Sequence, residues 1–130
     1  MDEKLASQLQ RLSKALSAFE SAVAEDDGDA KSRNSLLLCF VFTFEMACKT
    51  LHAALLVRGV DAPNYAVAIL KSAFRARLVT DASGWEMLRD HRNNVSHAYD
   101  EGLAVEIAAF VRDNAAPLFH QLIERVQRDD

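Results

Sequence analysis

Apolar residues recur at intervals of three and four along the first part of the chain. The members of this series are Leu5, Leu9, Leu12, Leu16, Phe19 and Val23. Such intervals place side chains on one face of an α-helix, because the helix completes a turn every 3.6 residues or so. A β-strand would need strict alternation, and no segment of this sequence shows a competing strand pattern. The series therefore predicts a helix with one apolar stripe that other helices must cover.

A second helix is predicted over residues 31–58, after an acidic loop at 25–29. Gly59 is a suitable stop because glycine readily takes the left-handed conformation that ends many helices. The stretch 36–57 is apolar enough to resemble a membrane-spanning segment, but polar side chains lie within it and are costly in lipid. These side chains are Glu45, Lys49 and His52. We therefore expect a buried central helix and no association with a membrane.

Three further helices are predicted, at about 64–78, from near Trp85 to near His97, and at 103–128. Asp81 or Ser83 can cap the first turn of the Trp85 helix, and Trp85 itself is expected to anchor it in the core. That helix must weaken at 97–99, because the residues that follow are poor helix formers. Pro117 predicts a kink or a short break inside the last helix.

Short connections between these helices favour antiparallel neighbours. With only four glycines and two prolines among 130 residues, the chain has few natural break points. We therefore predict an all-α protein, an antiparallel up-and-down bundle of four to five helices, formed by residues 1–130 as a single domain.

The formal net charge of -4 argues against coating of nucleic acid by bulk charge, although it leaves room for a local basic pocket. Cys39 and Cys48 lie nine positions apart, on opposite faces of one helix, so they cannot pair within it. We expect two reduced cysteines and a cytoplasmic protein. Cys48 and His52 alone offer too few ligands for a metal, and no cofactor is expected.

Residues with polar or ionisable side chains are concentrated between Arg92 and Tyr99. Arg92 and His97 are five residues apart, which is roughly 140° around an ideal helix. Arg92 aligns instead with Ser96, and Asn93 with His97. If Arg92 and His97 act together, the helix must end near His97, or a second copy of the chain must complete the site. A two-fold dimer would bring two copies of the segment together.

The residue types suit phosphate chemistry. Arginine offers a planar fork of donors to a phosphate or a phosphorane, and histidine exchanges protons near neutral pH. Such a pair can cleave RNA without a metal if histidine activates the 2′-hydroxyl and arginine stabilises charge on phosphorus. The plainer interpretation is a helix end with a polar cap, and the residues alone leave both open.

Glu45 and Lys49 have the i, i+4 spacing of a helix ion pair within an apolar helix. A buried charge needs a partner, so we expect a supporting role, with pairing near the Arg92 segment as one option. His91 is expected to be a solvated neighbour of Arg92.

The pattern Phe42-Thr43-Phe44-Glu45-x-x-x-Lys49, followed by Arg92-Asn93-x-x-Ser96-His97-x-Tyr99, resembles the HEPN superfamily. More narrowly, it is similar to the branch of nucleotidyltransferase substrate-binding proteins, over residues 31–126. That branch includes the toxins of toxin–antitoxin pairs formed by a HEPN protein and a minimal nucleotidyltransferase.

The resemblance implies a helical homodimer in which two Arg-x4-His motifs face one cleft. In toxin members this motif is a metal-independent endoribonuclease site, which assigns catalysis to Arg92 and His97 and substrate binding or orientation to Asn93 and Ser96. The implied partners are RNA, with transfer RNA as a candidate, and a cognate minimal nucleotidyltransferase that neutralises the toxin and can transfer AMP to Tyr99. The alternatives are a non-catalytic substrate-binding subunit of a nucleotidyltransferase complex and a purely structural dimer.

The sequence departs from the commoner family pattern at three places. An aromatic residue is frequent where Ala47 or Cys48 stands, and a glycine is frequent at Arg77. An arginine usually follows the proline, whereas Asn64 and Tyr65 follow Pro63 here. The last departure removes a possible contact to a phosphate or a partner.

Overall fold

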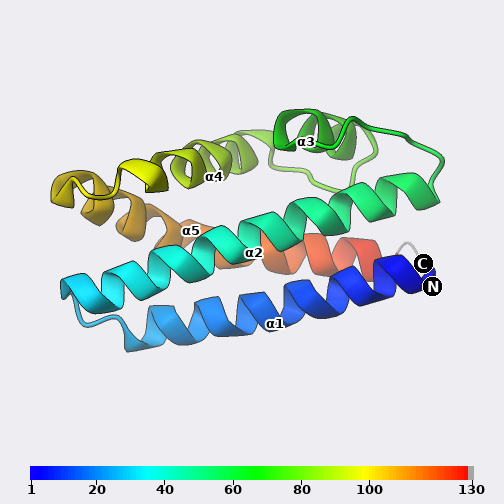
Figure 1. The fold of residues 1–130 in the computed structure, drawn as a ribbon. Coiled ribbons are helices and arrows are strands. Elements are labelled where there is room, and N and C mark those ends of the chain that lie inside the picture. Colours follow the sequence, from blue (N-terminus) through cyan, green and yellow to red (C-terminus); the bar gives the residue numbers. More distant parts are fainter. Residues whose placement is uncertain (129–130) are drawn as a thin grey trace.

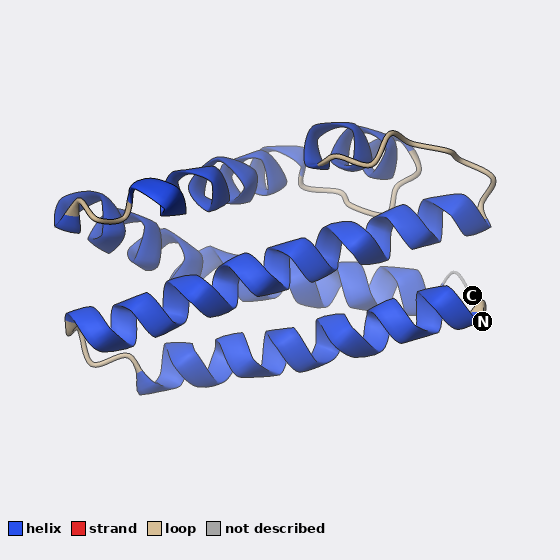
Figure 2. Cartoon of the chain, in the orientation of Figure 1, coloured by secondary structure: helices blue, strands red, loops and turns tan. Residues whose placement is uncertain are grey.

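The computed structural model describes residues 1–128, and every regular element in that part of the chain is helical (Figures 1 and 2). The elements are α1 (Glu3–Glu25), α2 (Ala30–Val57), α3 (Ala66–Arg75), α4 (Ala82–Asn94), the short 3-10 helix η1 (Val95–His97) and α5 (Glu101–Arg128). The predicted all-α class is confirmed.

The helices form an up-and-down bundle, in which α1, α2 and α5 each take one position and α3 and α4 share another (Figure 1). α1 and α2 lie side by side and antiparallel, and α5 packs behind them. α3 and α4 follow each other along the remaining position, so two short helices together take the place of one long helix. This arrangement brings the end of α4 and η1 to the same end of the bundle as the α1–α2 connection.

The apolar stripe of α1 faces α2 and α5. Its five leading members, Leu5, Leu9, Leu12, Leu16 and Phe19, are all buried, as the spacing predicts. Two threonines of α2 reinforce this packing. The Thr43 hydroxyl lies 3.1 Å from the Ala15 carbonyl, and the Thr50 hydroxyl lies 3.3 Å from the Gln8 carbonyl. Each hydroxyl also donates to the carbonyl four residues earlier in α2, at 2.7 Å for Thr43 and 2.8 Å for Thr50, so its single proton is shared between the two helices.

Five aromatic side chains form a closed ring of contacts in the core, with centroid separations of 5.7 to 6.4 Å. In order around the ring they are Phe19, Phe40, Phe44, Trp85 and Phe119. They come from α1, α2, α4 and α5, so each of the four positions of the bundle contributes at least one ring. Trp85 is 2% exposed and is the core anchor that the sequence predicts.

α2 is long and apolar enough to cross a membrane by composition alone, but half of its most apolar window is buried inside the bundle. The core helix of a helical bundle has the same composition, because it is surrounded by other helices.

α2 ends where the sequence predicts. Gly59 has a φ of 80°. The Val60 amide donates to the Leu55 carbonyl at 2.8 Å, and the Gly59 amide donates to the Leu56 carbonyl at 3.0 Å. This pair of bonds is a Schellman motif, which satisfies carbonyls that the helix end leaves free.

α3 ends three residues before its predicted limit, with the same motif built on a different residue. Arg77 takes the left-handed position with a φ of 61°, where glycine would be favoured. The Leu78 amide donates to the Ala73 carbonyl at 2.9 Å and the Arg77 amide to the Phe74 carbonyl at 3.1 Å. Glycine would take this backbone conformation without the steric cost that a side chain adds.

Two other boundaries differ slightly from prediction. α4 starts at Ala82, capped by Asp81, whose carboxylate accepts from the Gly84 amide at 2.8 Å. α5 starts at Glu101, because the Asp100 carboxylate accepts from the Leu103 amide at 3.0 Å and so caps that helix.

Of the kink or short break expected at Pro117, the break is not found, because α5 continues through this residue. Proline removes the hydrogen bond to the carbonyl four residues earlier. That carbonyl belongs to Asp113, and both Pro117 and Asp113 lie on the exposed side of α5. Water can therefore satisfy the freed carbonyl, which lowers the cost of a proline inside the helix.

Candidate functional site

Arg92 lies in the last turn of α4 and contacts α2. Its Nη2 atom donates to Glu45 Oε1 at 2.9 Å, and the two side chains are 35% and 42% exposed. Among the described residues, the ion-pair partner of Glu45 is therefore Arg92 and not Lys49, which is exposed. The i, i+4 spacing of Glu45 and Lys49 is thus not used for an ion pair within α2, and pairing with the Arg92 segment, the option named from the sequence, is what the structure shows.

A pocket of about 230 Å³ opens beside this ion pair, and we refer to it as the Arg92 pocket. α2 contributes Glu45 and Lys49 to its wall, and α4 contributes Arg92 and Asn93. Apolar residues of α2 and α3 and the connection between these helices complete the wall. The polar residues of that connection are Asn64 and Tyr65.

His97 and Tyr99 lie just beyond α4, where the helix gives way to η1 and then to a turn. The predicted weakening of the helix at this point is confirmed. Both side chains are exposed, Tyr99 by 87%, and their rings meet edge to face with centroids 6.3 Å apart. The Ser96 hydroxyl donates to the Asn93 carbonyl at 3.0 Å, which holds the turn and engages Ser96 locally.

The local geometry keeps Arg92 and His97 of one chain apart. In a 3-10 helix each residue advances about 120°, compared with about 100° in an α-helix. The η1 turn therefore places His97 roughly 160° around the axis from Arg92. Within residues 1–128, no hydrogen bond joins the two side chains. The end of α4 at Asn94 meets one of the two conditions expected from the sequence for joint action of these groups, and a second copy of the chain is the other.

Burial raises the pKa of the Cys48 thiol to about 12, and Glu45 adds to this effect while Arg92 opposes it. Burial also raises the pKa of Cys39. Both cysteines are free thiols, as their spacing predicts. Cys48 lines the Arg92 pocket, so it contributes an uncharged and apolar part of the wall at neutral pH.

Two features of this region escape prediction from sequence. Asn64 and Tyr65 complete the Arg92 pocket, and the Pro63 that precedes them is the only local signal of a fixed turn. His91 packs on Phe110 with ring centroids 4.5 Å apart, so it is not the solvated side chain expected beside Arg92.

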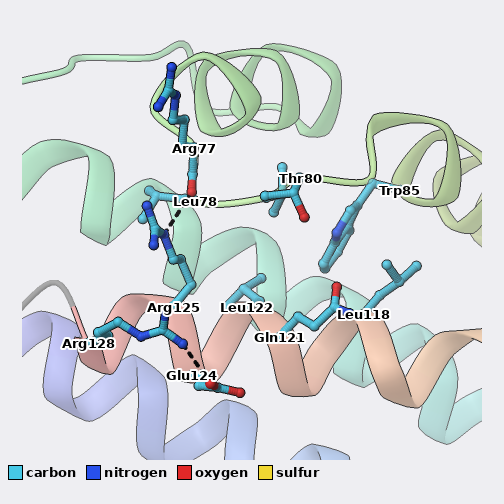
Figure 3. Close-up of a pocket in the computed structure, with 11 residues that line it drawn as sticks. Arg77, Leu78, Thr80, Trp85, Leu118, Gln121, Leu122, Glu124, Arg125 and Arg128 are labelled. Atoms are coloured by element: carbon cyan, nitrogen blue, oxygen red, sulfur yellow. Dashed lines mark hydrogen bonds and ion pairs between the residues drawn. The ribbon is translucent and has the colours of Figure 1, made fainter.

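A second hollow, of about 310 Å³, lies between α5 and the connection from α3 to α4 (Figure 3). Arg125 Nε donates to the Arg77 carbonyl across it at 3.0 Å, and Arg128 pairs with Glu124 at 2.7 Å. None of the predicted site residues lines this hollow. Its bonds tie the end of α3 to α5, and this gives it a structural role.

Two solved structures share this fold along most of the chain. A protein from Thermus thermophilus superposes with a TM-score of 0.82 at 26% identity, covering 90% of this chain and 99% of that one. A Haemophilus influenzae protein superposes with a TM-score of 0.80 at 24% identity, covering 92% and 98%. Its structure was described as revealing the fold of a substrate binding domain of a nucleotidyltransferase. The fold is thus of the class that this domain represents.

The model of the family described as nucleotidyltransferase substrate binding protein like matches residues 7–128, and this chain belongs to that family. A relative, the probable ribonuclease HepT of Haemophilus influenzae, is 31% identical over 97 residues, which is 69% of this chain. The chain covers 66% of that relative, just under two thirds of its length.

Proposed function

We propose that this chain is a metal-independent endoribonuclease whose site forms between two copies, and that a cognate minimal nucleotidyltransferase neutralises it. The observation that carries the proposal is the placement of Arg92 and His97. Glu45 holds the guanidinium beside an open pocket, and the imidazole stands exposed on the turn that follows. The likeness to a probable ribonuclease supports the same activity.

In the proposed reaction, His97 of one copy accepts the proton of the 2′-hydroxyl of RNA. The 2′-oxygen then attacks the neighbouring phosphorus and forms a cyclic phosphate, while the bond to the 5′-oxygen breaks. The leaving 5′-oxygen takes a proton from His97 of the partner subunit or from water. Arg92 donates to the non-bridging oxygens, where negative charge accumulates in the transition state.

The outward stripe of α2 provides the surface on which two copies would meet. Leu38 and Phe42 are 55% and 53% exposed and are spaced i, i+4. By helical spacing the same stripe continues into Glu45 and Lys49, next to Arg92. An exposed apolar pair that leads into a polar site is suited to an isologous interface, which buries the same residues from both copies.

Tyr99 is the proposed acceptor of AMP because its side chain is 87% exposed and lies beside the His97 ring. The phenolic oxygen would attack the α-phosphorus of ATP on the nucleotidyltransferase, with release of pyrophosphate and of the phenolic proton. The AMP group adds bulk and negative charge two residues from His97, and both oppose the approach of an RNA phosphate.

A second candidate function is a non-catalytic subunit that binds substrate for the nucleotidyltransferase. The family description favours it, and so does the engagement of Arg92 by Glu45, which partly neutralises the guanidinium. The two candidates differ in whether the isolated chain breaks RNA.

The test incubates total RNA and transfer RNA in EDTA with protein made without its partner, after mass spectrometry has shown that Tyr99 is unmodified. Wild type and His120→Ala, which removes a histidine paired with Glu20 away from the site, should cleave. His97→Ala and Arg92→Ala should be slower by at least about a hundredfold. Cleavage that persists in both variants, or no cleavage by unmodified wild type, would favour the binding subunit instead.

A further inference from the structure

We propose that the Arg92 pocket binds one nucleobase of the RNA beside the cleaved phosphate, with Tyr65 as its stacking platform. The inference rests on the proposed function, since it assigns a subsite to the same substrate. It concerns residues in which this chain departs from the commoner family pattern, namely the pair that follows Pro63.

Tyr65 is a wall of the Arg92 pocket and is 60% exposed. Its backbone is extended, with φ -145° and ψ 154°, because it stands one residue before the first turn of α3. An exposed aromatic ring in a pocket is suited to stacking on an unpaired base, and this contact tolerates any of the four bases.

Two amide side chains stand beside this ring. Asn64 comes from the α2–α3 connection and Asn93 from α4, and both are exposed. Each offers an oxygen acceptor and an amino donor. Within residues 1–128, neither side chain is hydrogen-bonded to another part of the chain. Both amides are therefore available to the polar edge of a base, on which donors and acceptors alternate.

Cations lie at the same opening. Lys49 is exposed, and the Arg92 guanidinium gives one of its five N–H donors to Glu45 in the ion pair. These groups suit the phosphate attached to a bound nucleoside. Phe44, Cys48 and Ile69 supply an apolar floor. The volume of about 230 Å³ lies below the roughly 300 Å³ at which pockets for drug-sized ligands begin. A single base therefore matches the space better than a whole nucleotide does.

The connection that carries Asn64 and Tyr65 is fixed in place. Ala62 is 4% exposed, and its carbonyl accepts from His52 Nε2 at 3.1 Å. The Tyr65 amide donates to the Pro63 carbonyl at 2.9 Å. A platform that is already ordered avoids the entropy cost of fixing a loop on binding.

The test measures binding without cleavage, on the His97→Ala background and in EDTA. The probes are short fluorescent oligouridylate and oligoadenylate strands. Tyr65→Ala should raise the dissociation constant about tenfold, which corresponds to one lost stacking contact. Tyr65→Trp should bind as tightly as the parent. Phe74→Ala is the matched control, because Phe74 is a 47% exposed aromatic residue of α3 outside the pocket, and it should bind like the parent.

Photocrosslinking of a strand that carries iodouridine gives an independent readout, and mass spectrometry should find the crosslink at Tyr65. Unchanged affinity in Tyr65→Ala with no crosslink at Tyr65 would overturn the inference, and so would failure of every probe to bind. Normal cleavage by the wild type would in that case leave the proposed function standing. If binding depends on Tyr65 but the wild type cleaves no RNA, the base subsite would be supported and the proposed ribonuclease activity would be rejected.

Discussion

The ion pair between Glu45 and Arg92 is a positioning contact in this molecule, because it joins α2 to the last turn of α4. Removal of the carboxylate in Glu45→Ala should lower kcat for RNA cleavage about tenfold, since the guanidinium loses the group that orients it. Stability should change by less than about 1 kcal/mol, because the pair is partly exposed and such pairs contribute little.

The Glu45 prediction is checked by single-turnover cleavage and thermal melting, with Glu106→Ala as the control. Glu106 is an exposed acid of α5 that lines none of the described pockets near Arg92. Equal cleavage rates in Glu45→Ala and wild type would show that Arg92 needs no help from Glu45.

Cys48 offers a second test at the residue scale. Because burial raises its pKa to about 12, nearly all of this thiol is protonated at pH 8, and the thiolate is the reactive form. We expect iodoacetamide to leave Cys48 unmodified in the native protein over a time in which the unfolded protein reacts fully. Peptide mass spectrometry gives the extent at each cysteine. Rapid native alkylation of Cys48 would mean that the pocket wall opens frequently.

At the scale of the helix, the end of α3 makes an unusual demand on Arg77. A residue with a side chain loses roughly 1–2 kcal/mol of folding stability in this left-handed conformation. Glycine avoids that loss, but its unfolded chain has more conformational freedom, which offsets part of the improvement. Arg77→Gly should therefore stabilise the fold by up to about 1 kcal/mol, measured by denaturant unfolding.

Arg75→Gly is the matched control for Arg77→Gly. It removes the same side chain two residues earlier, inside α3, where glycine should cost about 1 kcal/mol. The backbone explanation predicts that the free energy of unfolding rises in Arg77→Gly and falls in Arg75→Gly. A loss of stability in both variants would show that the Arg77 side chain itself contributes more than its backbone costs.

The connection between α1 and α2 should make the fold sensitive to acid. The pKa of Asp26 lies below its ordinary value of 3.8, first because its carboxylate accepts from the Gly28 amide, and further because of Arg112 on α5 and the Ser32 hydroxyl. A lowered pKa means that the charged carboxylate stabilises the fold above about pH 4. That contribution is lost as pH falls through the folded-state pKa.

Asp26→Asn should lower the melting temperature by a few degrees at pH 7, as expected for the loss of about 1 kcal/mol from one charge-assisted bond. The difference between variant and wild type should shrink as the pH is lowered below the pKa of the wild-type carboxyl. A difference that stays constant from pH 7 to pH 2 would rule out the charge as its source.

At the scale of the whole molecule, the proposed site requires two copies. Phe42→Asp places a charge in the exposed apolar pair of α2. We expect this variant to be a monomer by light scattering at micromolar concentration and to lose cleavage, while the wild type is a dimer. Phe74→Asp changes an equally exposed aromatic residue on α3 and should remain a dimer. A monomeric wild type that cleaves RNA would refute the shared site.

Much of the fold could be predicted because burial follows local spacing. The α1 stripe and the stop at Gly59 each depend on a few neighbouring residues, and both are found as predicted. The end of α3 could not be predicted, since an arginine in the left-handed position has no local sequence signal. The short break at Pro117 was expected but is not found for a related reason, because the cost of a proline inside a helix depends on which side of α5 faces solvent.

The sequence predicted the part of the site that lies in one continuous segment, but not the contacts that other helices make with it. The Arg92 to Tyr99 motif lies in one short segment and ends its helix as the sequence suggests. The partner of Glu45 is 47 residues away, and the choice between Arg92 and Lys49 depends on how α4 lies on α2. The walls at Asn64 and Tyr65 depend on the same packing, so spacing alone gives no sign of the pocket.

Trp85 is the only tryptophan in the chain, and its place in the aromatic ring makes it an intrinsic optical probe. The indole contacts Phe44 of α2 and Phe119 of α5 from its own position in α4. Its emission should be shifted to the blue in the native protein and should move to the red when any of these helices separates. A stopped-flow fluorescence trace would therefore record the assembly of the bundle without an added label.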